Sequence, residues 1–315
     1  MRNEQERDPF LGSYLDATAH KAMLQDVVRT TAYDEALRRA VRPGARVIDF
    51  GAGTGVLSIF AARHGAAVVD AVERTSFVEK ARRIAKDSGY PAIRFHQADH
   101  QTFTTDGRAD VLVSEWMGHF LFYEAMLGPL LEVRDRWLAP HGVMIPQKVS
   151  AHAGLVTDEQ FHEDLSFLVN GPYGIDFSAI ALTPLEQCHL VALQPDQLLE
   201  SVFELGTLDM KTLDKVPEHL EGRGRVEREA TVYGIVAWFS MELVTDFFIG
   251  TGPHDPETHW QQVYFPFVEP IDVSPEREIA LGIWPPMQNE EFQPTWKWSF
   301  DDGATHAFTD STAHP

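Results

Sequence analysis

Cysteine is almost absent from this sequence: Cys188 is the only one in 315 residues. One cysteine can form neither an intrachain disulfide nor a cysteine-based metal cluster. No run of 18 apolar residues occurs, and the first ten residues lack the apolar centre of a signal peptide. We therefore expect no metal site, no membrane span and, by default, a cytoplasmic location.

Positive charge is scarce as well. The chain has 26 lysines and arginines against 47 aspartates and glutamates, which gives a formal net charge of −21. Phosphate binding needs a basic surface, so nucleic acid is not an expected partner. The acidity suits a cationic ligand or substrate, although the same composition would also serve solubility alone. Composition by itself leaves both interpretations open.

The first half of the chain alternates short apolar strands with helical stretches. Apolar residues at helical spacing predict one or two helices within 15–39, and further helices over 55–63 and 77–87. Strands are predicted around 47–48 and at 68–73, 93–97, 109–115 and 142–146. This alternation predicts an α/β fold, a Rossmann-like parallel sheet with helices on both faces and ligands at the carboxyl ends of the strands.

A glycine-rich turn follows the first strand. It reads "DFGAGTGV" from Asp49 to Val56, so valine stands where the dinucleotide fingerprint needs its last glycine. A bound pyrophosphate is therefore not favoured. Glu73, at the end of the second strand, is placed to accept hydrogen bonds from two ribose hydroxyls. Together they predict a nucleoside cofactor without a diphosphate, S-adenosylmethionine; a phosphate ligand or a purely structural turn is the alternative.

Two acids frame an apolar stretch in "SEWMGHFLFYEAM". Glu115 and Glu124 are separated by eight residues, most of which are apolar. Carboxylates are rarely buried without a partner. We expect the apolar residues to fold the stretch back as a packed hairpin, so that both acids face one cavity. The alternative is that one of the two acids is an ordinary surface residue.

Four segments together resemble the protein arginine methyltransferases: the glycine turn, "AVE" at 71–73, the double-acid stretch and "THW" at 258–260. Their order and spacing fit that family from about 10 to about 300. The resemblance implies that Glu115 and Glu124 grip a guanidinium group. Guanidinium stays protonated at neutral pH and its planar fork of donors matches carboxylates. Two carboxylates would draw its positive charge away from the target nitrogen, which could then attack a sulfonium methyl group.

The resemblance implies further roles around these acids. Asp26 pairs with His259 to close the site, with the histidine as a base or only as a strut, and Tyr14 hydrogen-bonds one of the glutamates. Trp260 forms a wall of the arginine pocket, unless it is a plain core residue. Met126 lies beside the substrate.

On the cofactor side, Arg29 is implied to bind the methionine carboxylate, with a surface charge as the alternative. The other expected cofactor-binding residues are Asp49, Gly51, Gly53, Glu73, His100 and Met23. Met23 and Met126 match positions that argue mildly against symmetric dimethylation, although methionine is also common core filler. Phe10 and Leu11 depart from the family's Tyr-Phe pair. Gln101 replaces the family's usual glutamate near adenine, so Asp99 or His100 is expected to contact the adenine edge.

Strand patterns dominate after residue 146, notably at 231–244, 261–268 and 295–300. We expect two domains: N-terminal helices with a Rossmann-like cofactor domain over 1–146, and a β-barrel-like substrate domain over 147–315. A helix-prone insertion at about 158–193 resembles the family's dimerisation arm, which implies a homodimer.

The expected reaction is S-adenosylmethionine-dependent N-methylation of a guanidino group. The short ends and the altered Tyr-Phe pair favour free L-arginine or another small guanidino compound as substrate. Arginine residues of proteins are the alternative. A cofactor-binding scaffold without catalysis is a remote one, since the residues of the expected site are all present.

Overall fold

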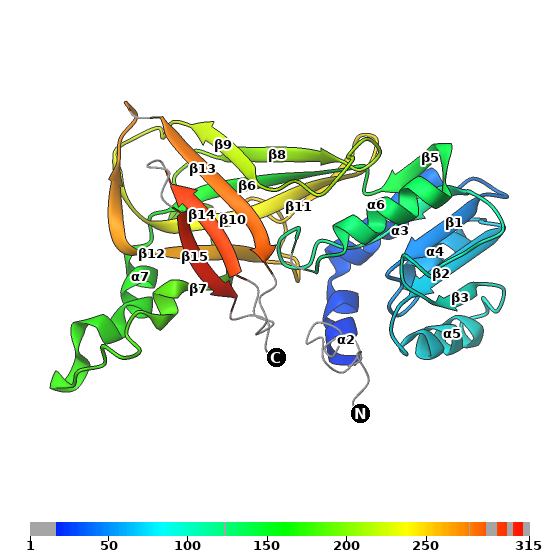
Figure 1. The fold of residues 1–315 in the computed structure, drawn as a ribbon, viewed down its shortest axis with the longest axis horizontal. Helices are drawn as coiled ribbons and strands as arrows, with labels where there is room; N and C mark the ends of the chain where they lie inside the picture. Colours follow the sequence, from blue (N-terminus) through cyan, green and yellow to red (C-terminus); the bar gives the residue numbers. More distant parts are fainter. Residues whose placement is uncertain (1–16, 123, 277, 288–294, 301–304, 311–315) are drawn as a thin grey trace.

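The computed structural model describes residues 17–122, 124–276, 278–287, 295–300 and 305–310. The expectations for Phe10, Leu11 and Tyr14 lie outside the described residues. A parallel sheet with its helices occupies one end of the molecule, and a larger, mostly antiparallel sheet occupies the other (Figure 1). No helix in the part of the chain that the structure describes is long and apolar enough to cross a membrane.

The first half forms five parallel strands in the order β3-β2-β1-β4-β5. The strands are β1 (Arg46–Phe50), β2 (Val68–Glu73), β3 (Arg94–Gln97), β4 (Ala109–Val113) and β5 (Leu138–Ile145). The helices are α2 (Ala17–Gln25), α3 (Val27–Ala40), α4 (Val56–Arg63), α5 (Val78–Asp87) and α6 (Leu127–Trp137). The predicted Rossmann-like sheet is confirmed.

Helix α6 was not predicted from the sequence. Its first residues, "LGP", contain a glycine and a proline, which normally signal a turn. Pro129 occupies the first turn of α6, where a helix has no use for the missing N–H group and proline is tolerated. Leu127, Leu130 and Leu131 are buried, so packing of this face supports the helix despite its poor start.

The second half forms one curved sheet in the order β8-β6-β10-β12-β7-β15-β14-β13-β9, with β11 paired to β10. Its neighbours are antiparallel except for the parallel pair β7–β15. The two end strands β8 and β9 also contact each other, so the sheet curls into a barrel-like shape. The strands are β6 (Lys148–Val156), β7 (Gln187–Val191), β8 (Phe203–Asp209), β9 (Leu220–Gly224), β10 (Ala230–Val244), β11 (Phe247–Gly250), β12 (Gln262–Val273), β13 (Ile279–Met287), β14 (Thr295–Phe300) and β15 (Thr305–Asp310).

The segment predicted as a dimerisation arm extends away from the strands (Figure 1). It contains α7 (Glu159–Leu165) and three short 3-10 turns, η2 (Phe167–Asn170), η3 (Pro172–Gly174) and η4 (Thr183–Glu186). The expected end near 193 is too late, because β7 already pairs with β12 inside the sheet. The turn η5 (Pro195–Gln197) follows β7. The protruding part therefore ends near residue 186.

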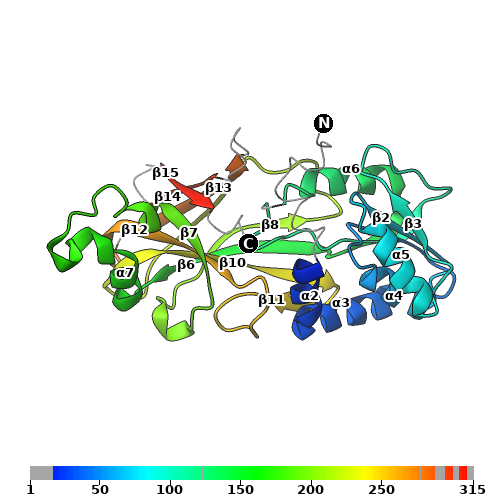
Figure 2. The same ribbon diagram turned by 90° about the horizontal axis from the view of Figure 1, so that it is seen from below.

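Helix α3 lies between the two halves, against α4 on one side and β10 and β11 on the other (Figure 2). Arg134 of α6 adds a second link, because its Nη1 donates to the backbone oxygens of Met210 and Leu213, 2.9 and 2.7 Å away. These contacts, and a buried apolar cluster with members from both sheets, fix the cofactor half against the barrel.

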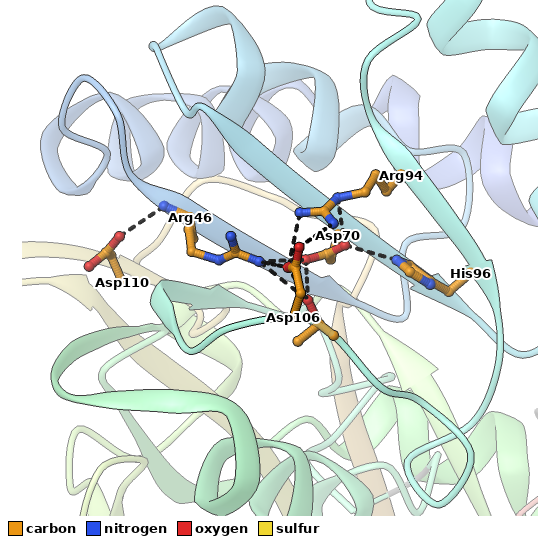
Figure 3. A network of polar contacts seen from close by, with 7 residues as sticks. Arg46, Asp70, Arg94, His96, Asp106 and Asp110 are labelled. Carbon is orange, nitrogen blue, oxygen red and sulfur yellow. Dashed lines mark hydrogen bonds and ion pairs between the residues drawn. The ribbon is translucent and has the colours of Figure 1, made fainter.

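A polar network stabilises the parallel sheet at the amino ends of its strands, opposite the ligand-binding edge (Figure 3). Asp70 of β2 is buried; it lies 2.9 Å from His96 Nε2 and 3.2 Å from Arg94 Nε, and accepts a 2.8 Å bond from Thr105 Oγ1. Burial alone would raise the pKa of Asp70, but these hydrogen bonds and the Arg94 charge hold it below the ordinary value.

The exposed carboxylate of Asp106 completes this network. It bridges Arg46 of β1 and Arg94 of β3, and both arginines hold its pKa at about 2. Asp106 lies near the end of the 98–108 connection between β3 and β4, so the network also anchors this far end of the connection, whose near end borders the cavity described below.

Replacing Asp70 with Asn should lower the free energy of unfolding by about 2–4 kcal/mol, because it removes the charge from a buried network. A group whose folded pKa is depressed stabilises the fold fully above its unfolded pKa of 3.8, and this contribution disappears as the pH falls through the folded pKa. The difference between wild type and variant should therefore be constant from pH 7 to pH 5 and shrink only below about pH 4, as measured by urea denaturation. Asp87→Asn, at an exposed ion pair, is the control and should change stability by under about 1 kcal/mol.

Candidate active site

A cavity of about 390 Å³ opens at the carboxyl edge of the parallel sheet. Its walls come from α2 and α3, the ends of β1 and β2, the start of the 98–108 connection and the double-acid stretch. Nine of the predicted site residues line it: Met23, Arg29, Gly51, Gly53, Glu73, His100, Glu115, Glu124 and Met126. This volume lies in the range of small-molecule sites.

The glycine turn has the left-handed backbone that only glycine adopts without strain. Gly51, Gly53 and Gly55 have φ angles of 80°, 51° and 77°. A Cβ atom on Gly51 would lie 2.8 Å from the Cε of Met126, so this methionine packs directly on the turn. The N–H of Gly53 donates to Glu73 Oε2 at 3.0 Å. The turn therefore brings backbone close to the cavity and fixes the Glu73 carboxylate at the adjoining strand end.

Asp49 lies behind this turn and does not line the cavity. Its side chain is fully buried, and its Oδ2 accepts a 2.6 Å hydrogen bond from Ser58 Oγ on α4. Burial raises the pKa of Asp49 to about 6. This side chain, which was expected to bind the cofactor, therefore contacts α4 behind the turn rather than lining the cavity.

Glu115 forms a buried ion pair with Arg29. Its Oε2 accepts hydrogen bonds from Arg29 Nη2 at 2.7 Å and Nε at 3.2 Å, and its Oε1 accepts a long bond of 3.4 Å from the N–H of Met117. Burial would raise the pKa of Glu115, but the Arg29 charge holds it below the ordinary value, so the group is ionised at neutral pH. Arg29, predicted to bind a ligand carboxylate, thus also neutralises one of the two acids.

Glu124 lines the same cavity, as predicted. The described residues between the acids, 116–122, contain no strand, with bends at 119–120 and a turn at 121–122 in place of a regular hairpin, and φ is positive at Gly118 and Leu121. Five of these residues are almost fully buried: Trp116, Met117, Phe120, Leu121 and Phe122. Their burial turns the stretch back on itself, which brings the two acids to one cavity.

Asp26 and His259 meet across the boundary between the two halves. Asp26 caps α3, with its Oδ1 accepting a 2.8 Å hydrogen bond from the N–H of Arg29. Its Oδ2 lies 2.8 Å from both the backbone N and the Nδ1 of His259. Burial would raise the pKa of Asp26, but the His259 bonds lower it. Because an ionised carboxylate only accepts, Nδ1 of His259 carries a hydrogen.

Trp260 is 1% exposed and does not line the cavity, so its surroundings are those of the alternative, a plain core residue, rather than of a wall of the arginine pocket. It packs edge-on against Phe239 and lies beside the ring of His259. The Arg29 guanidinium carbon lies 5.9 Å from its ring centroid. Trp260 therefore supports the Arg29–Glu115 pair from behind.

His20 also lies at the site; the sequence places it in order with Met23 and Arg29 on the N-terminal helix but gives it no role of its own. This buried residue of α2 lines the cavity and packs on Phe77, with the ring centroids 4.0 Å apart and the ring planes tilted by 36°. Its Cε1 lies 3.1 Å from a Cβ built on Gly53. A lone histidine carries no pattern by itself; only its place three residues before Met23 on the same helix could have suggested it.

Asp99 and His100 both line the cavity, whereas Gln101 is exposed and does not. Asp99 Oδ1 accepts hydrogen bonds from the N–H groups of Gln101 and Thr102, so this carboxylate shapes its own loop. Arg136 of α6 donates to the backbone oxygen of His100. The cavity wall formed by Asp99 and His100 is thus held by hydrogen bonds within its own loop and by Arg136 of α6.

Comparison with known families assigns both halves. Residues 147–301 match the family described as the arginine methyltransferase oligomerization subdomain, and residues 42–189 match a methyltransferase domain. Protein arginine N-methyltransferase 1.1 of Arabidopsis thaliana is 30% identical over 288 residues, which is 87% of this chain and 73% of the relative. Protein arginine N-methyltransferase 1 of Saccharomyces cerevisiae is 30% identical over 279 residues, 84% of this chain and 79% of the relative.

Solved structures agree with these matches. A chain of the Trypanosoma brucei PRMT1 enzyme-prozyme heterotetrameric complex with AdoHcy superposes with a TM-score of 0.84 and 27% identity, covering 94% of this chain and 99% of that one. Protein arginine methyltransferase 10 of Arabidopsis thaliana shares the fold with a TM-score of 0.77 at 22% identity, over 94% of this chain and 99% of that one.

Replacing Gly51 with Ala should weaken binding of S-adenosylhomocysteine at least about tenfold, because the new methyl group displaces Met126 from the cavity wall. Left-handed strain of about 1–2 kcal/mol accompanies any such change. Gly89→Ala is the matched control, since Gly89 has a φ of 89° but nothing within 4 Å of a built Cβ. Calorimetric titration of both variants separates the two effects; equal binding by both would refute the steric role of Met126.

Proposed function

The chain belongs to the protein arginine methyltransferase family, and from this premise we propose that it methylates arginine residues of proteins, with S-adenosylmethionine as methyl donor. The observation that carries the proposal is the meeting of Glu115 and Glu124 at one cavity with the glycine turn. The two acids suit a guanidino substrate, and the glycine turn suits a nucleoside cofactor. Methyl transfer from such a cofactor to such a substrate explains why both features meet at one cavity.

The cavity residues suit this cofactor. Glu73, fixed by Gly53, presents a carboxylate for ribose hydroxyls, and Asp99 and His100 form the adjoining wall for the adenine edge. Arg29 offers a buried cation for the amino-acid carboxylate, with Met23 Sδ 4.0 Å from its Nη2. When bound, the cofactor supplies an electrophilic sulfonium methyl group.

The charges at the acids match a single guanidinium. Glu115 and Glu124 carry two negative charges and Arg29 carries one positive charge, so the three leave one negative charge for the substrate cation. The carboxylates orient the planar guanidinium and polarise it, so that one nitrogen can direct a lone pair at the methyl group. That nitrogen becomes strongly acidic as the methyl group arrives, and a carboxylate in contact with it can accept the released proton.

We assign Asp26 and His259 to holding α3 against the barrel half. Neither residue lines the cavity, whereas the two glutamates do. Their 2.8 Å contacts join the helix that carries Arg29 to the loop that carries Trp260.

We propose arginine residues of proteins as the substrate, in place of the free L-arginine or small guanidino compound that the sequence favoured. The relatives described above are named protein arginine N-methyltransferases, and those names support the alternative substrate. The sequence features that suggested a small substrate were the short ends and the altered Tyr-Phe pair, and those residues lie outside the described part of the chain.

A homodimer through the arm is the proposed assembly. Six large apolar side chains of the arm are between 40% and 88% exposed: Phe167, Val169, Tyr173, Ile175, Ile180 and Leu182. Such a concentration of exposed apolar surface is typical of an interaction site. The match of residues 147–301 to an oligomerization subdomain agrees with this use.

Incubation of the protein with S-adenosylmethionine and an Arg/Gly-rich peptide should give mono- and dimethylated peptide by mass spectrometry. Free L-arginine at the same concentration should react at least about tenfold more slowly. Methylation of free arginine alone would reverse the substrate assignment, and no methylation of either would refute the proposed function.

The Glu124→Gln variant should lose at least about 10²-fold in kcat, because it keeps the shape but removes one of the charges that polarise the guanidinium. Binding of S-adenosylhomocysteine should stay within about threefold of wild type. Glu218→Gln, at an exposed glutamate, is the control and should have normal kcat. A Glu124→Gln enzyme with near-normal turnover would contradict the role of this acid.

Substitution of Ile175 and Ile180 by Asp should convert the dimer to monomer or weaken it at least about tenfold, because each isoleucine would bury apolar surface worth about 1–3 kcal/mol. Light scattering after size exclusion measures the change. Phe248→Asp, at an exposed apolar residue of β11, should leave the dimer intact. Loss of the dimer only in the Phe248 variant would move the interface away from the arm.

A further inference from the structure

His119 lies at the turn of the double-acid stretch and has no part in the function proposed above. Within 116–122, only Gly118 and His119 are partly exposed; the other five residues are buried. The Nδ1 atom of His119 lies 3.4 Å from the backbone oxygen of Trp260. This contact joins the stretch that carries both acids to the loop that carries His259.

Both of these loops have strained backbone at their turns. Leu121 and Ala125 have φ angles of 46° and 52°, and Gln261, next to Trp260, has a φ of 54°. Each non-glycine residue in this region costs about 1–2 kcal/mol and keeps its conformation only where neighbouring contacts hold it. A polar contact between the two loops therefore contributes to the geometry of each of them.

The contact also closes a ring of interactions around the cavity. Glu115 pairs with Arg29, whose N–H is bound by Asp26, and Asp26 binds His259. From His259 the chain runs directly to Trp260, and the Trp260 oxygen meets His119 between the two acids. The His119 contact therefore adds a polar link between the segment that separates the two acids and the barrel half.

We propose that His119 is a positioning residue of the methyl-transfer reaction: its Nδ1–H donates to the Trp260 carbonyl and locks the acid stretch onto the 258–260 loop. The carbonyl can only accept, so Nδ1 carries the hydrogen. One such bond adds little stability, but a displacement of about 1 Å in a catalytic group can lower turnover about 10²-fold. The inference rests on the proposed function.

The test compares His119→Asn with His119→Leu. These side chains have nearly the same shape, but only the asparagine amide can replace the Nδ1–H donor. The Leu variant should lose at least about tenfold in kcat on the peptide, with its KM within about threefold and S-adenosylhomocysteine affinity within about twofold of wild type. The Asn variant should recover at least half of the wild-type kcat. His306→Leu, at an exposed histidine of β15, is the control and should be unchanged.

A second measurement does not depend on turnover. Hydrogen–deuterium exchange should rise together in 116–125 and 258–261 in the Leu variant and return toward wild type in the Asn variant. A folded Asn variant as slow as the Leu variant, a Leu variant with normal kcat, or unchanged exchange in both loops would overturn the proposal. Inactivity of the wild-type enzyme would refute the proposed function alone, because the exchange result would still decide whether His119 locks the loops.

Discussion

The Asp26 carboxylate is the contact on which the arrangement of the site depends. One oxygen caps α3 at Arg29, and the other binds the backbone and ring of His259 from the barrel half. A cap normally satisfies only the end of its own helix. Here the same side chain also decides where the helix meets the second domain, so the position of Arg29 and the position of the 258–260 loop are not independent.

The burial of Glu115 follows from this arrangement. An ionised carboxylate removed from water needs a partner, and the geometry at Asp26 places the Arg29 guanidinium 2.7 Å from it. Tyr33 and Trp260 lie 5.8 and 5.9 Å from the guanidinium carbon and surround the pair with aromatic rings. Breaking the Asp26 contact would therefore affect the acid through the helix, even though Asp26 and Glu115 share no direct bond.

The sequence was sufficient for features that depend on local pattern. Strands β1, β2 and β4 follow from runs that contain β-branched residues, and the glycine turn from residues that favour left-handed backbone. The joint placement of Glu115 and Glu124 at one cavity follows from the apolar residues between them. The sequence was insufficient where tertiary packing decides: α6 begins at a glycine and a proline, Asp49 bonds to Ser58 behind the turn, and Trp260 is covered by Phe239 and His259. Whether a side chain faces a cavity or its rear wall depends on neighbours that no spacing reveals.

The net charge of −21 acts on the substrate in a different way from the two acids. In the proposed function, the acids hold one guanidinium at short range, where burial limits screening. The remaining acidity acts over distances comparable to the Debye length of about 8 Å, so it raises the rate of encounter and weakens with salt. Free arginine carries a net charge of only about +1 at neutral pH, because its carboxylate offsets its amino group, whereas an arginine-rich segment carries one positive charge per side chain. A strongly acidic surface therefore attracts the segment more than the amino acid, which is an argument for a protein substrate that does not depend on the relatives.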